Sequence, residues 1–123
     1  MDSAASTDTG IYDPTKPLAC SIQSADVPDH IALIEQMRSN LTSIARTSHG
    51  VVLRWPLSVA NRAGAERFAV EEQRCCEFWG FDVTSSQDAV VLRWDGPPAT
   101  SAFMDRLVAF FEGHAPIGAL FSL

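Results

Sequence analysis

Apolar side chains recur every three or four residues in three parts of the chain, residues 24–47, 58–79 and 100–111. This spacing places them on one side of a helix, so each part is predicted to be a helix with one buried face. Ser58 or Asn61 can cap the second helix, because their side-chain oxygens accept hydrogen bonds from the first turn. The three apolar stripes are Ile31, Ile34, Met37, Leu41 and Ile44; then Ala65, Phe68, Ala69, Cys76 and Trp79; then Phe103, Leu107, Phe110 and Phe111.

Short runs of β-branched and aromatic residues predict four strands, at residues 18–22, 51–55, 81–84 and 89–94. The element order is then β-α-β-α-β-β-α. This order predicts an α+β fold: a two-layer sandwich in which helices cover one face of a small four-stranded sheet.

The two ends of the chain differ from the rest. Residues 1–17 are polar and interrupted by prolines, so we expect a flexible N-terminal lead-in. Residues 18–123 are predicted to form a single α+β domain, because this length is ordinary for one domain. Residues 115–123 are apolar, and we expect them either to dock on the core or to form a contact between two copies of the chain.

Composition excludes several classes of function. Hydrophobic residues make up 46% of the chain and charged residues 20%, which favours a packed core over disorder. The net charge of −6 argues against a nucleic-acid partner, which requires clustered Lys and Arg. No apolar run is long enough to cross a bilayer, and the first residues lack the features of a signal peptide. We therefore expect a cytoplasmic protein without a membrane partner.

The three cysteines are the strongest candidates for chemistry. Cys75 and Cys76 are adjacent, and we expect both to be reduced thiols, because the cytoplasm keeps thiols reduced and neighbouring cysteines close only a strained ring. Thiolates are ligands for soft ions such as Cu(I), and Cys20 can supply a third sulfur if its strand lies near the second helix. The alternative is that the cysteines only pack, as buried cysteines often do.

Glu72 is a carboxylate within an apolar stripe. It lies three residues before Cys75 and four before Cys76, on the same face of the predicted helix. If it is buried there, its pKa should rise and it can donate a proton; the alternative is an ion pair with Arg54 or Arg93. Adjacent helical side chains diverge by about 100°. Both cysteines can therefore point to one ion only if the helix unwinds near its end.

These residues carry a resemblance. A Glu-Glu-x-x-Cys-Cys-x-Phe-x-x-Phe motif at residues 71–81 and a Cys-x-Ile start at Cys20 resemble a group of small, mostly uncharacterised bacterial proteins. That group has a Cys-x-Leu start, so Ile22 departs from its pattern. It is similar in kind to proteins met beside genes for mercury, arsenic or copper handling. The resemblance implies a role in heavy-metal or metalloid resistance, and it singles out Cys20, Glu72, Cys75 and Cys76.

Three functions fit these residues. The first is binding of a thiophilic metal or metalloid ion of the Cu(I), Hg(II) or As(III) type by Cys20, Cys75 and Cys76, with no other cofactor. The second is a reaction with a cysteine thiolate as nucleophile and Glu72 as general acid or base, for instance protonation of a carbon–metal bond as in organomercurial lyases. The third is a small dimeric interaction module with structural cysteines.

Overall fold

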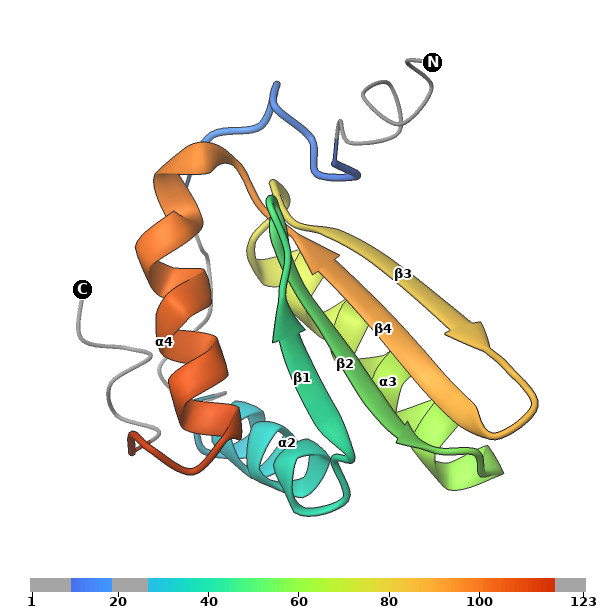
Figure 1. Cartoon of the computed structure of the whole chain (residues 1–123). Coiled ribbons are helices and arrows are strands. Elements are labelled where there is room, and N and C mark those ends of the chain that lie inside the picture. The colour runs from blue at the N-terminus through green and yellow to red at the C-terminus, as the bar shows by residue number, and fades with distance from the viewer. Residues whose placement is uncertain (1–9, 19–26, 117–123) are drawn as a thin grey trace.

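The computed structural model describes residues 10–18 and 27–116. Its centre is a four-stranded antiparallel sheet with the strand order β1-β2-β4-β3 (Figure 1). The strands are β1 (Ser43–Arg46), β2 (Gly50–Pro56), β3 (Gly80–Ser85) and β4 (Ala89–Asp95). The long pairing of β2 with β4 brings together the two strands that share the residues Leu-Arg-Trp.

Helices cover one face of this sheet. They are α2 (Val27–Ser39), α3 (Val59–Cys75) and α4 (Ser101–Phe111), with the short 3-10 helix η2 (Pro98–Thr100) leading into α4. Helix α4 packs along β1 and β2, and α3 packs on β3 and β4 (Figure 1). The predicted α+β fold, a small four-stranded sheet with helices, is therefore confirmed.

Alternation along the central strands explains why only one face is covered. Val51, Leu53 and Trp55 of β2 are buried, whereas Val52 is half-buried and Arg54 is exposed. Successive side chains of a strand point to opposite faces, so the buried set faces the helices. Strand β4 follows the same pattern as far as Trp94: Val90, Leu92 and Trp94 are buried, whereas Val91 and Arg93 are half-buried on the opposite face.

Trp94 joins the helices to the sheet. Its ring lies 5.3 Å from Phe68 of α3, 5.3 Å from Trp79, 5.2 Å from Phe81 of β3 and 6.2 Å from Phe103, as measured between ring centroids. Trp94 itself is only 2% exposed. Because α3 and α4 both contact this one side chain, they lie on the same face and share one core.

The first predicted helix is wrong at its end. It was expected to continue to residue 47, but α2 ends at Ser39 and residues Ser43–Arg46 form the edge strand β1. The backbone N–H of Thr42 donates to the carbonyl of Arg54 at 2.8 Å, and strand pairing starts there. Ile44 fits the helical stripe and also the inward side of a short strand, so pairing with β2 decided the outcome. The strand predicted at residues 18–22 lies, from residue 19 onward, outside the described residues.

Part of the expected flexible lead-in is docked. We call residues 10–17 the strap, which crosses one end of the sheet (Figure 1). The N–H of Ile11 donates to Oδ2 of Asp95 at 3.1 Å, and the N–H of Asp13 donates to the carbonyl of Phe78 at 3.1 Å. A Cβ atom on Gly80 would lie 2.1 Å from the carbonyl oxygen of Ile11, so the close approach requires glycine here. A polar sequence docks in this case through its backbone. The apolar tail lies beyond the described residues from residue 117.

The two faces of β2 give a direct test of this architecture. Leu53→Ala should reduce the free energy of unfolding by about 2–5 kcal/mol, because Leu53 is fully buried between its neighbours in β1 and β4. The adjacent change Arg54→Ala should stay within about 0.5 kcal/mol, because that side chain is exposed. Urea unfolding of both variants measures the difference, and equal losses would contradict the assigned faces.

Candidate thiol site

The site forms where α3 ends. Ser58 caps the helix, because its Oγ accepts a hydrogen bond from the N–H of Asn61 at 2.9 Å. Of the two predicted capping residues, Ser58 is therefore the one that caps α3. The last helical residue is Cys75, and Cys76 has φ −133° and ψ 89°, outside the helical region. The helix is therefore shorter than the predicted limit of residue 79. The helical conformation therefore ends between the two cysteines.

The two cysteines are in different chemical states. Cys76 is 6% exposed and forms a disulfide, whereas Cys75 is half-buried and is a thiol. The expectation that all cysteines are reduced is therefore wrong for Cys76. That expectation came from the inferred compartment, which says nothing about which sulfurs the fold brings together. Cys20 lies outside the described residues, so its expected approach to the pair stays a prediction.

Glu72 is a buried residue in the last turn of α3. It is 7% exposed, and its backbone carbonyl accepts the N–H of Cys76 at 2.8 Å. Burial, and to a lesser extent the negative charge of Glu71, raises the pKa of Glu72 from 4.5 to about 8. The predicted rise is confirmed. Glu72 is therefore mainly a neutral carboxylic acid at pH 7, and it can donate a proton.

The alternative partners for Glu72 lie elsewhere. Arg93 donates from Nη2 and Nε to Oδ2 of Asp95, at 2.7 and 3.1 Å. Arg54 is exposed, and both arginines alternate with buried strand residues, so they point to the face of the sheet away from the helices. The predicted ion pair of Glu72 with Arg54 or Arg93 is wrong, because Glu72 approaches from the helical side.

The charged side of α3 faces away from the cysteines. This side of the helix and the strap border an open groove of about 460 Å³. The groove is lined by Ile11, Asp13, Lys16, Val70, Gln73, Arg74, Glu77 and Trp79. At 3.6 residues per turn, Arg74 lies on the opposite side of the helix from Glu72 and Cys76. Arg74 is thus not placed to stabilise a thiolate at Cys76, and the negative end of the helix dipole does not stabilise one either.

Sequence reasoning missed Asp95. This acid was not among the candidate residues, but it is fully buried and joins the strap to Arg93. The signal that was available is a row of glycines: Gly50 and Gly80 lie opposite Asp95 on the two neighbouring strands. Small residues on both sides of a strand acid indicate close backbone approach.

Within residues 10–18 and 27–116, no group of three or more His, Cys, Asp or Glu side chains is arranged to hold a metal ion. No helix in the same part of the chain is long and apolar enough to cross a membrane. Comparison with protein-family models, with curated proteins and with solved structures found no match to this chain.

The raised pKa of Glu72 predicts how stability changes with pH. The folded state holds this proton up to about pH 8, whereas the unfolded chain releases it near 4.5. Its contribution to stability is complete at low pH and is lost as pH rises through the folded pKa. Glu72→Gln removes this dependence, so the variant should resemble wild type at low pH and exceed its free energy of unfolding at high pH by roughly a few kcal/mol.

Thermal unfolding between about pH 5 and pH 9 makes the comparison. Glu66→Gln is the matched control, because Glu66 is an exposed acid of the same helix whose side chain pairs with Arg62 at 2.8 Å. If both variants follow the wild-type pH profile, Glu72 is ionised in the fold and the account of its burial is wrong.

Proposed function

We propose that the end of α3 is a centre for thiol–disulfide exchange, in which Glu72 donates and accepts the proton of Cys76. One observation carries this proposal: a buried, protonated carboxylic acid lies one helical turn before a cysteine that forms a disulfide. A disulfide that only stabilises the fold does not need a proton donor beside it. Burying the ionised carboxylate of Glu72 would also be unfavourable.

The reaction is written with a low-molecular-weight thiol as the reductant. Its thiolate attacks the sulfur bonded to Sγ of Cys76; the disulfide bond breaks, and a mixed disulfide forms. Cys76 leaves with the electron pair and takes the proton of Glu72, which becomes a carboxylate. A second thiolate then attacks the reductant's sulfur in the mixed disulfide, and the partner sulfur leaves with the electron pair. The two protons that the two attacking thiols released go to this leaving sulfur and to the carboxylate of Glu72. In total two thiols are oxidised to one disulfide, and the protein disulfide is reduced to two thiols.

Burial explains why a local acid is useful. The leaving thiolate of Cys76 is almost shielded from water, and a charge in such a position is unfavourable unless it is neutralised. Glu72, with a pKa of about 8, still holds its proton at pH 7. It can therefore transfer this proton to the leaving sulfur, and its carboxylate can take the proton back when the disulfide forms again.

Glu72→Gln should therefore slow reduction of the disulfide. At pH 7 we expect the rate constant with dithiothreitol to fall by roughly a hundredfold, the lower range for loss of a general acid. The reaction is followed by quenching samples with an alkylating agent and measuring the number of alkylated thiols by mass spectrometry. Glu66→Gln, which changes an exposed acid of the same helix, should react like wild type. An unchanged rate in Glu72→Gln would reject the role of Glu72, and Cys76→Ser should lack the disulfide altogether.

A second function is favoured by the helix end. Because Cys76 leaves the helical conformation, its side chain is no longer held at the helical angle from Cys75. We propose that the reduced protein binds a thiophilic metal or metalloid ion, such as Cu(I), Hg(II) or As(III), through Cys75 and Cys76, with Cys20 as a third sulfur. Thiols lose protons on binding, and Glu72 in its ionised form can accept one.

Titration of fully reduced protein tests this function. With Hg(II), wild type should show sulfur-to-metal absorption that saturates at one ion per chain, and Cys75→Ser with Cys76→Ser should abolish it. Cys20→Ser should weaken binding if the third sulfur takes part. Equal binding by wild type and the double variant would reject the proposal.

A further inference from the structure

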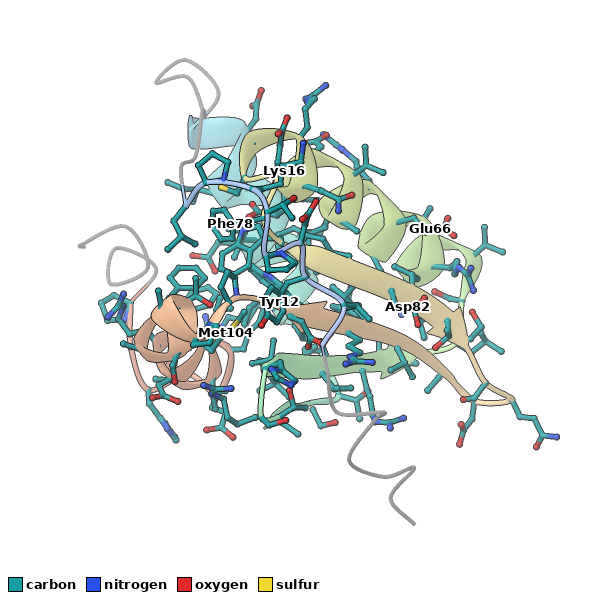
Figure 2. All side chains as sticks on the ribbon, turned by 90° about the horizontal axis from the view of Figure 1, so that it is seen from above. Tyr12, Lys16, Glu66, Phe78, Asp82 and Met104 are labelled. Carbon is teal, nitrogen blue, oxygen red and sulfur yellow. The ribbon has the colours of Figure 1, made fainter. Side chains whose placement is uncertain are left out.

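The groove beside α3 lies between two walls that the fold holds in place. The strap forms one wall, and the outward side of α3 forms the other. Figure 2 shows the strap running from Tyr12 past Phe78 to Lys16. Its backbone is held by the N–H of Asp13, which donates to the carbonyl of Phe78 at 3.1 Å. The volume of about 460 Å³ lies within the range of about 300–1,000 Å³ that is common for small-molecule sites.

Each wall contributes a large apolar side chain that is open to solvent. Ile11 of the strap is 39% exposed and Val70 of α3 is 65% exposed, and both line the groove. Trp79 also lines it, but this side chain is buried in the core. Single exposed apolar side chains are common on protein surfaces. Two of them on the two walls of one groove offer contacts to an apolar group of a ligand.

The charged side chains that line the groove differ in whether they have partners. Nζ of Lys16 lies 3.6 Å from Oε1 of Glu77, so these two charges balance each other. Oδ1 of Asp13 accepts hydrogen bonds from the N–H and the hydroxyl of Thr15, at 2.9 and 2.6 Å. The guanidinium of Arg74 has no ion pair or hydrogen bond to any residue in the described part of the chain. Arg74 is therefore the cation that a ligand can reach.

The surrounding charges favour one kind of anion. Two basic and two acidic side chains line the groove, so the carboxylates of Asp13 and Glu77 would repel a doubly charged anion more than a singly charged one. The net charge of −6 on the whole chain acts in the same direction. A carboxylate carries a single charge, and a planar guanidinium can hold it through two parallel hydrogen bonds.

We propose that this groove binds a small amphipathic carboxylate, with Arg74 holding the carboxylate group and with Ile11 and Val70 contacting the apolar chain. The site uses neither Glu72 nor Cys76, which lie on the opposite side of α3 from Arg74. The proposal therefore adds a ligand site to the proposed thiol chemistry and does not depend on it.

Titration of the full-length protein with hexanoate tests this site. The backbone amide signals of the groove residues, followed by NMR of nitrogen-15-labelled protein, should shift and saturate with a Kd of about 1 mM. Arg74→Gln should weaken binding about tenfold or more, through the loss of one charge-assisted hydrogen bond. Val70→Thr keeps the branched shape and replaces one methyl group, so it should weaken binding roughly threefold. The control Arg54→Gln removes the same charge at an exposed position outside the groove and should bind like wild type.

Three further probes test the class of ligand. Hexylammonium and hexanol carry the same chain with a positive charge or none, and inorganic phosphate carries negative charge without the chain. Each should bind about tenfold or more weakly than hexanoate. A probe that binds as tightly as hexanoate would overturn the assignment to an amphipathic carboxylate. Unchanged binding in Arg74→Gln, or no saturable shift with hexanoate up to about 10 mM, would overturn the site itself.

Discussion

Packing of α3 on the inner face of the sheet is the interaction on which the site depends. The helix buries Ala65 and Phe68 against this face, and Phe68 meets Trp94 edge to face. At helical spacing the same stripe continues to Glu72 and on to Cys76, so the packing that stabilises the core also removes the carboxyl group from water. The raised pKa of Glu72 is thus a consequence of its position in the buried apolar stripe.

The protein contains two buried acids, and the fold accommodates them differently. Asp95 lies next to a guanidinium and accepts a backbone N–H, so its environment supplies positive charge and donors. Glu72 lies in an apolar stripe beside the charge of Glu71, which favours its neutral form. An ion-paired acid holds structure together, whereas a neutral acid beside a disulfide can transfer a proton. The first seats the strap and the second is suited to chemistry, and both lie close to the turn after Cys76.

Sequence periodicity predicted the larger elements because each has a long, unambiguous pattern. Helices α3 and α4 and strands β2, β3 and β4 lie where the stripes and β-branched runs place them. Strand β1 was missed because four residues fit either period, and pairing with β2 made the choice. Glu72 was found from its position in an apolar stripe. The strap and Asp95 were not, because a polar segment that docks through its backbone leaves no apolar pattern, and neither does the acid that receives it.

The disulfide of Cys76 was missed for a different reason. Sequence can suggest a compartment, but whether two sulfurs meet depends on three-dimensional placement. The consequence for function is considerable, since a cysteine in a disulfide cannot bind an ion as a thiolate. The proposed ion binding would therefore need the reduced cysteines, whereas the proposed thiol–disulfide exchange would start from the disulfide.

The protonation state of Glu72 in the folded protein tests the central claim most directly. Carbon-13 NMR of protein labelled in the glutamate side chains, with Glu72→Gln to assign the signal, follows the carboxyl group through a pH titration. The account predicts a neutral carboxyl at pH 7 and a midpoint of about 8. A carboxylate that is already ionised at pH 7, with a midpoint near the ordinary value of 4.5, would contradict it.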